Sequence, residues 1–266
     1  MRFLRTLLSA FAACAAISAH AATATTDFSD LWFNSDEEGW GANVIQQNNV
    51  LFVTVFVNNQ SNAPVWYVAS AVTQVASTGT TVNFTGPLYQ TTAPYFGGTF
   101  NEANVSNRQV GALTFSASQI SAATLTYSVD GVNVTKQVRR QTWRAENIAG
   151  TYLGAVSGTW SGCGGPRNGY QESFVTLTVT QDNLAIGMRE DGAGGTYTCT
   201  YTGNYSQDGR MGAIAGNVLC TDGVNQQFIA SEVQGGIQNL SMRLVSAQTG
   251  GTCTFIGRIG GMRRAP

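Results

Sequence analysis

Three consecutive acidic residues, 36–38, form the densest acidic cluster of the chain and directly precede the Gly-Trp-Gly run at 39–41. In a hydrolase, Glu37 would serve as a general acid or base beside tryptophans that stack on sugar rings. A glycosidase also needs a second carboxylate at a defined separation, here from Glu102 or Asp130. Because adjacent turn residues point in different directions, we predict no catalytic pair within the cluster. We interpret it as a solvated turn in which Glu37 accepts hydrogen bonds from groups near residues 39–41.

The only histidine, His20, lies in a segment that resembles a secretory signal peptide over residues 1–21. Arg2 and Arg5 precede an apolar run, and Ala19-His20-Ala21 resembles a cleavage site, which predicts a mature chain starting near Ala22. Such a chain has no imidazole, which excludes Ser-His-Asp and Cys-His catalysis and histidine-bearing zinc sites. The sequence predicts no cofactor and no metal site. We expect a secreted or periplasmic protein.

Bulk composition favours a well-folded core. Charged residues make up 11% of the 266 residues and hydrophobic residues 43%, which is the opposite of a disordered chain. With the leader removed, 12 of the 14 basic residues remain against 15 acidic ones. Since no basic patch is present, we expect no nucleic-acid binding. Apart from the leader, no apolar run has the ~20 residues of a membrane-spanning helix.

The chain has a β-strand pattern throughout. Glycine is frequent (31) and proline scarce (5), and short alternating runs are separated by turn dipeptides. The clearest hairpin joins residues 123–129 to 132–139 through Asp130-Gly131, which suits a type I′ turn. This register places Leu125 opposite Lys136 on the apolar face, so we expect the lysine near a sheet end with its ammonium in water. Residues 50–57 are apolar almost throughout and predict a strand buried on both faces.

Four cysteines remain in the mature chain, and an even number in an exported protein predicts disulfides. Three pairings are possible, of which we favour Cys199–Cys220 and Cys163–Cys253. Cys199 and Cys220 share a face of the hairpin around Asp208-Gly209, either directly opposite or one pair apart. A bond from Cys163 to Cys253 would tie the first strand of that half to the last.

A boundary near residues 144–150 divides the mature chain into two units. We predict an all-β protein of two packed antiparallel units, small barrels or sandwiches, over residues 22–146 and 147–266, the second with two disulfides. Gly158-Thr159-Trp160 is similar to the Gly-x-Trp of the first strand in lipocalin- and avidin-like barrels, which favours an up-and-down barrel.

The N-terminal unit carries a longer motif, in which Trp32, Asn34, Glu37, Gly39-Trp40-Gly41 and Asn43 are followed by an apolar strand and then by Pro64, Trp66 and Tyr67. The chain resembles here a family of secreted, uncharacterised Gram-negative bacterial β proteins with the pattern Trp-x-Asn-x-x-Glu-x-Gly-Trp-Gly-x-Asn. The resemblance covers most of residues 27–143. It implies export but no particular activity.

Aromatic side chains are concentrated in the same unit, where they could stack on sugar rings, hold an apolar ligand or fill the core. We predict a non-catalytic binding or surface-interaction protein whose ligand is a glycan, another envelope component or a small apolar molecule. The alternatives are a carboxylate-dependent hydrolase of envelope or extracellular polymers and a structural envelope component. The predicted ligand-binding residues are Trp32, Glu37, Trp40, Asn43, Trp66 and Tyr67.

Overall fold

The computed structural model describes residues 26–265. The predicted signal peptide, with His20 and the expected cleavage site at Ala21, lies outside the described residues. Within residues 26–265, no helix has both the length and the apolar character needed to cross a membrane.

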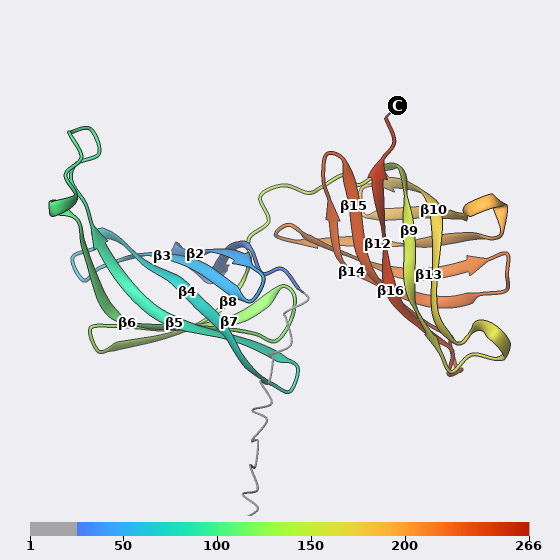
Figure 1. The fold of residues 1–266 in the computed structure, drawn as a ribbon, viewed down its shortest axis with the longest axis horizontal. Helices are drawn as coiled ribbons and strands as arrows, with labels where there is room; N and C mark the ends of the chain where they lie inside the picture. Colours follow the sequence, from blue (N-terminus) through green and yellow to red (C-terminus); the bar gives the residue numbers. More distant parts are fainter. Residues whose placement is uncertain (1–25, 266) are drawn as a thin grey trace, which may run out of the picture.

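The protein is all-β and consists of two closed antiparallel barrels, which occupy the two halves of Figure 1. In each barrel, every strand pairs with its sequence neighbours and the first strand pairs with the last, so both are up-and-down barrels. The first barrel comprises β1 (Asp30–Asn34), β2 (Glu37–Gln47), β3 (Val50–Asn58), β4 (Pro64–Thr78), β5 (Thr81–Thr92), β6 (Ser106–Ala117), β7 (Ala122–Val129) and β8 (Val132–Arg140). The second comprises β9 (Gly150–Ser161), β10 (Gly169–Asp182), β11 (Ala185–Gly192), β12 (Thr198–Asp208), β13 (Met211–Cys220), β14 (Asn225–Gly235), β15 (Asn239–Ala247) and β16 (Thr254–Arg263).

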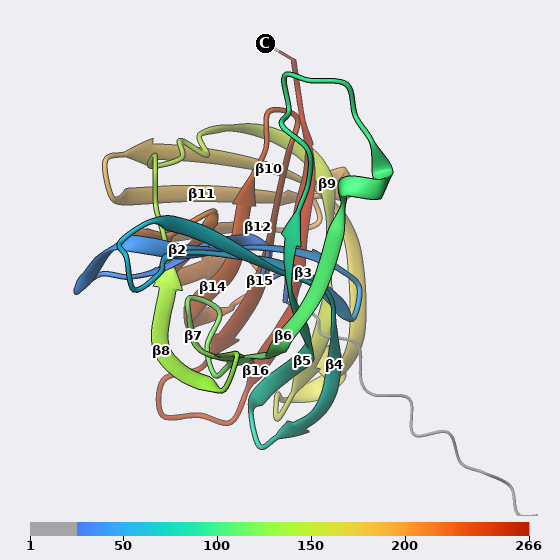
Figure 2. The ribbon, with the colours of Figure 1, turned by 90° about the vertical axis from the view of Figure 1, so that its left-hand side faces the viewer.

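Three short 3₁₀ segments lie in the loops: η1 (Glu102–Asn104), η2 (Gly165–Arg167) and η3 (Ala193–Gly195). The segment η1 belongs to the long connection between β5 and β6. This hairpin extends beyond the body of the first barrel, as the green loop in Figure 2 shows.

The predicted β7–β8 hairpin is confirmed. Val129 pairs with Val132 and Leu125 with Lys136, and both turn residues, Asp130 (φ 48°) and Gly131 (φ 87°), have the positive φ that a type I′ turn requires. Alternate residues of these strands face the barrel interior, where Leu125 is fully buried.

The expectation that residues 50–57 are buried on both faces is wrong. Alternate residues Leu51, Val53 and Val55 are fully buried, whereas Phe52 and Phe56 are 41% and 40% exposed. A single-sheet barrel has one interior, so a strand in it buries one face only. Among the described residues, the second barrel does not cover the outer face of β3, because the two barrels meet at the β12–β13 turn.

The end of the first barrel that faces the second is closed by a buried cation. The guanidinium of Arg140 on β8 lies 4.9 Å from the ring centroid of Trp32 on β1 and 3.1 Å from the carboxylate of Asp30. Trp32 Nε1 donates to the carbonyl of Phe28 at 2.9 Å. Together these groups fill the end of the barrel and satisfy its polar atoms.

The second barrel is closed in the same way, although the aromatic residue differs. Arg263 on the last strand lies 4.9 Å from the ring centroid of Tyr152 on the first strand, and its Nη2 donates to the tyrosine hydroxyl at 2.6 Å. The Tyr152 hydroxyl donates to the carbonyl of Ile148, four residues earlier. The likeness between the two halves therefore lies in this closure and in the strand order.

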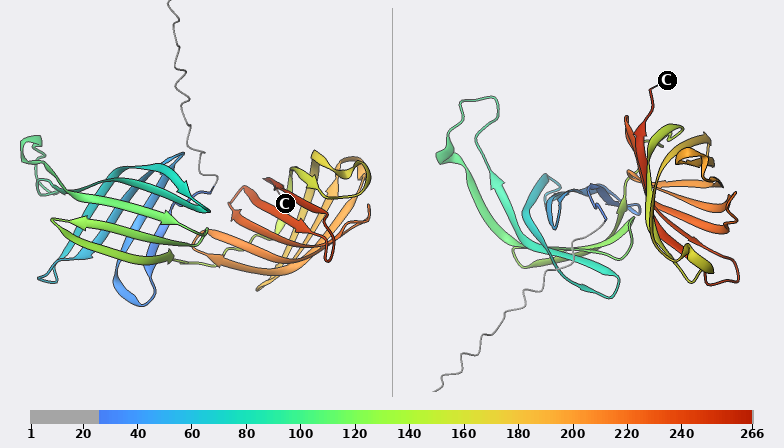
Figure 3. Two further views of the ribbon diagram at one scale, coloured as in Figure 1. Left: turned by 90° about the horizontal axis from the view of Figure 1, so that it is seen from below. Right: turned by 45° about the vertical axis from the view of Figure 1, so that its right-hand side comes forward.

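The turn of the β12–β13 hairpin joins the two closed ends. Figures 1 and 3 show this orange hairpin reaching toward the first barrel. Gly209 N donates to Thr142 Oγ1 at 2.8 Å and Arg210 N donates to Asp30 Oδ2 at 3.0 Å, while the Arg210 side chain pairs with Asp27. The two open ends consequently lie away from this junction, at opposite ends of the molecule.

Both favoured disulfides are confirmed, and they lie in the second barrel. Cys199 is directly opposite Cys220 in the β12–β13 ladder, because the pair next to the turn is Asp208 with Met211. Cys163, just after β9, is bonded to Cys253, just before β16. Both bonds lie toward the open end of this barrel.

Candidate functional site

Trp32, the first of the predicted ligand-binding residues, belongs to the core of the first barrel. It is fully buried, and its ring packs edge-on against Phe115 at 5.0 Å between centroids, beneath Arg140. The structure thus gives Trp32 a packing and closing role beneath Arg140.

Glu37 and Trp40 meet at the open end of the first barrel. Trp40 Nε1 donates to Glu37 Oε2 at 3.2 Å, and Lys136 forms an ion pair with the same carboxylate. Lys136 Nζ also lies 5.7 Å from the Trp40 ring centroid. The hydrogen bond from Lys136 is the main cause of a lowered pKa of Glu37. Glu37 is consequently ionised and charge-paired, whereas a general acid at neutral pH needs a raised pKa.

The remaining predicted residues lie on different faces. Tyr67 is partly buried and packs against the same core as Trp40. Asn43 is exposed on the outer face, and so is Trp66, which is 57% exposed and pairs with Phe56 across β3 and β4. The structure therefore brings Glu37, Trp40 and Tyr67 to one barrel end and does not bring Trp32, Asn43 or Trp66 to it. The hollow beside Trp40 measures about 320 Å³ and is shallow and open.

The second barrel contains a more enclosed pocket at its open end, with a volume of about 170 Å³. We call it the Glu190 pocket. Its walls combine apolar and aromatic side chains with a few charged groups, and they include Trp160, Arg167, Glu190, Tyr197, Tyr201 and Asp222.

Glu190 is the central polar group of this pocket. It continues the inward-facing positions of β11 after Ile186 and Met188 and is only 2% exposed. Tyr197 donates its hydroxyl to Glu190 Oε1 at 2.6 Å, and Tyr201 donates its hydroxyl to Oε2 at 2.7 Å. Burial raises the pKa of Glu190, and the two tyrosine hydroxyls oppose this increase only in part.

Local sequence explains why the two tyrosines converge on this carboxylate. Tyr201 shares the inward face of β12 with Cys199, which is the direct cross-strand partner of Glu190. Tyr197 precedes β12, and its ring lies over Gly192, where an added Cβ would be 2.5 Å from a ring carbon. A glycine at the end of β11 therefore leaves room for the Tyr197 ring to enter the pocket.

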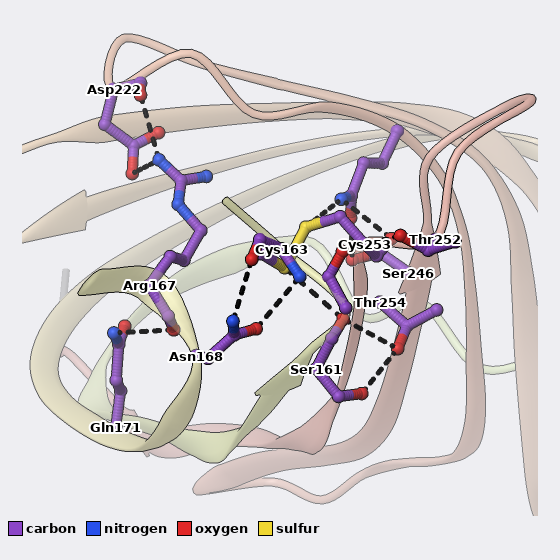
Figure 4. Close-up of a disulfide and its surroundings, with 12 residues drawn as sticks. Ser161, Cys163, Arg167, Asn168, Gln171, Asp222, Ser246, Thr252, Cys253 and Thr254 are labelled. Carbon is purple, nitrogen blue, oxygen red and sulfur yellow. Dashed lines mark hydrogen bonds and ion pairs between the residues drawn. A yellow bond between two sulfur atoms is a disulfide. The ribbon is translucent and has the colours of Figure 1, made fainter. Parts of the chain in front are cut away.

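The rim of the pocket is held by both disulfides. Figure 4 shows Arg167 reaching from the loop after Cys163 to Asp222, with the Cys163–Cys253 bond in the centre of the view. Arg167 Nη2 lies 3.2 Å from Asp222 Oδ2, and its guanidinium carbon lies 5.3 Å from the Trp160 ring centroid. Asp222 follows Cys220 by two residues, so the ion pair bridges two crosslinked loops.

The sequence motifs point to the N-terminal barrel and do not predict the Glu190 pocket. One signal was available in residues 185–192, because the period-2 phase that buries Ile186 and Met188 also places Glu190 on the inner face. The same phase through Cys199 places Tyr201 inside. Nothing in the sequence pattern shows that the two residues meet.

Among residues 26–265, no group of three or more His, Cys, Asp or Glu side chains is arranged to hold a metal ion. No protein-family model matches the chain, and no curated protein shows significant sequence similarity to it. The site is therefore interpreted from its own chemistry.

Proposed function

We propose that this protein is an exported, non-catalytic binding protein that takes one small organic ligand into the Glu190 pocket. The observation that carries the proposal is a carboxylate, 2% exposed, at the wall of an otherwise largely aromatic and apolar pocket. Binding sites are typically concave and mostly apolar with a few placed polar groups. A pocket of this kind has a polar group to orient a ligand and apolar walls to retain it.

The size of the pocket favours a small ligand over a glycan chain. Its volume of about 170 Å³ is close to that of apolar cavities, ~150 Å³, that accept a benzene ring. The small-molecule alternative among the expected ligands is therefore the better supported. The same size argues against the hydrolase hypothesis at this pocket, since a polymer needs an extended groove.

Export is part of the proposal. Two disulfides persist in oxidising compartments and are rare in the cytosol of mesophiles, which supports a secreted or periplasmic location. The resemblance of residues 27–143 to secreted Gram-negative proteins favours the same location. The alternative is a structural role in the envelope, and binding of a ligand in the pocket would argue against it.

Protein-observed NMR with a fragment library tests the proposal on the full mature chain. We expect some fragments to shift the amides of Tyr197, Cys199 and Tyr201 together. The variant Ser173→Phe, whose side chain enters the pocket mouth, should abolish these shifts. Its matched control is Thr176→Phe on the outer face of the same strand. Shifts confined to Trp40 or Trp66, or none at all, would overturn the assignment to this pocket.

A further inference from the structure

We propose that the Glu190 pocket selects a small organic cation, an amine or quaternary ammonium group attached to no more than one ring, which pairs with the Glu190 carboxylate. The inference rests on the proposed function, because it names the ligand class of the same pocket. It is carried by the charges of the buried groups and by the aromatic walls.

Glu190 lacks the cationic partner that comparable carboxylates in this protein have. Asp30 and Glu232 both have side chains that are 4% exposed, and they pair with Arg140 and Arg258 respectively. Among the described residues, Glu190 forms no ion pair, and its two hydrogen-bond donors are neutral tyrosines. Burying a carboxylate without a counter-charge is costly. A cationic ligand would supply the missing charge.

The walls of the pocket suit a cation as well. Trp160, Tyr197, Tyr201 and Phe255 all line it, and aromatic ring faces attract ammonium groups, more strongly where water is excluded. The Trp160 ring already carries the guanidinium of Arg167 at 5.3 Å. This contact lies at the rim and leaves the deeper tyrosine rings free of a cation among the described contacts.

The net charge of the pocket lining is negative, as a cationic ligand requires. Glu172, Glu190 and Asp222 contribute carboxylates, and Arg167 contributes the one guanidinium among the lining residues. Arg167 is paired with Asp222, so its charge is neutralised locally. Asp191 and Asp222 also add to the field that raises the pKa of Glu190. This field attracts a cation and repels an anion.

Cation binding should be coupled to proton release. Because burial raises the pKa of Glu190, the carboxyl holds a proton more readily in the empty pocket than in water. A bound ammonium group favours the ionised form and therefore lowers that pKa. Binding a permanent cation then releases up to one proton at a pH where Glu190 is protonated in the empty pocket.

Three ring compounds of similar size test the inference by titration calorimetry: benzylamine, neutral benzyl alcohol and anionic benzoate. We expect benzylamine to bind about tenfold or more tightly than benzyl alcohol, because a hydrogen bond to an ionised group is stronger than a neutral one. Benzoate should bind most weakly. Benzyltrimethylammonium, measured in buffers of different ionisation enthalpy, should show proton release.

The variant Glu190→Gln keeps the shape of the side chain and removes its charge, and we expect it to bring the benzylamine to benzyl alcohol affinity ratio to about one. Asp182→Asn, an exposed residue beside the β10–β11 turn and outside the pocket lining, is the matched control and should keep the ratio. Equal binding of cation and alcohol by the wild type would overturn the ligand class and leave the proposed function standing. Failure of all three compounds, together with a negative fragment screen, would overturn both.

Discussion

The guanidinium of Arg140 lies over the ring of Trp32, 4.9 Å from its centroid, and both side chains are fully buried. Arg263 and Tyr152 repeat the ring contact in the second barrel at the same 4.9 Å, with Tyr152 fully buried and Arg263 partly exposed. In both cases the aromatic residue is on the first strand and the arginine on the last. The contact therefore seals the seam where each barrel closes on itself.

Replacing Arg140 with alanine should destabilise the first barrel by about 3–5 kcal/mol, the range for breaking a buried ion pair. The variant leaves Asp30 unpaired in the core and removes the hydrogen bonds from Arg140 to the carbonyls of Asp27, Ser29 and Ile120. Denaturant unfolding followed by tryptophan fluorescence measures the loss.

The neighbouring Arg139→Ala is the matched control for Arg140→Ala. The Arg139 side chain is 56% exposed and lies 3.6 Å from Asp208, so its removal should cost no more than about 1 kcal/mol. Similar losses in the two variants would contradict a closing role for Arg140.

The fold was largely predictable because strand alternation and turn chemistry are local. Asp130-Gly131 specifies its own turn, and the register of the β7–β8 hairpin follows from that turn. Cys199 and Cys220 likewise share one face of their hairpin in either register, which favours the bond between them. Closure of each unit into a barrel removes its unpaired strand edges, but strand alternation alone does not distinguish a barrel from a sandwich, and the prediction left both open.

The site was harder to predict, because it depends on contacts between residues distant in sequence. Trp32 and Trp40 both face inward, and Trp32 pairs with Ala42, only two residues beyond Trp40. The Trp32 ring nevertheless packs under Arg140, whereas the Trp40 ring meets Glu37 and Lys136. Residue type alone does not distinguish a tryptophan that closes the barrel core from one that lines an open end. Glu190 is similarly indistinguishable from a solvated glutamate until the phase of its strand is read.

Gly209→Ala should loosen the contact between the barrels. Gly209 has φ +59°, and a Cβ there would lie 2.2 Å from Asp30 Oδ2 and 2.7 Å from Arg140 Cβ. We expect faster proteolysis of residues 141–149 and a larger radius of gyration by solution scattering. Gly131→Ala is the control, since it has φ +87° and no neighbour within 4 Å and shares only the backbone cost of about 1 kcal/mol. Equal behaviour of the two variants would refute the role of the turn.

Removing the two disulfides should have unequal effects on the second barrel. Cys163–Cys253 closes 90 residues and Cys199–Cys220 closes 21. The chain-entropy model gives contributions of about 4.5 and about 3 kcal/mol respectively. The double variant Cys163→Ser/Cys253→Ser should therefore be less stable than Cys199→Ser/Cys220→Ser in calorimetric unfolding. The opposite order would show that local packing around Cys199 outweighs loop closure.

Glu190→Gln should make the stability of the second barrel less sensitive to pH. Burial raises the pKa of Glu190 above its ordinary value of 4.5, so above that pH the folded protein retains a proton that the unfolded chain has lost. The free energy of unfolding then falls as pH rises, by at most about 1.4 kcal/mol per pH unit for one group. The variant lacks this decline, and its stability relative to the wild type should increase from about pH 4.5 upward until Glu190 is ionised in both states.

Glu37, Asp130 and Asp191, whose pKa values are lowered, act in the opposite sense in both proteins and so cancel in the comparison. Hydrogen exchange of β11 and β12 amides across this range measures the difference, and a difference that does not change with pH would mean that Glu190 ionises in the folded barrel as it does in water.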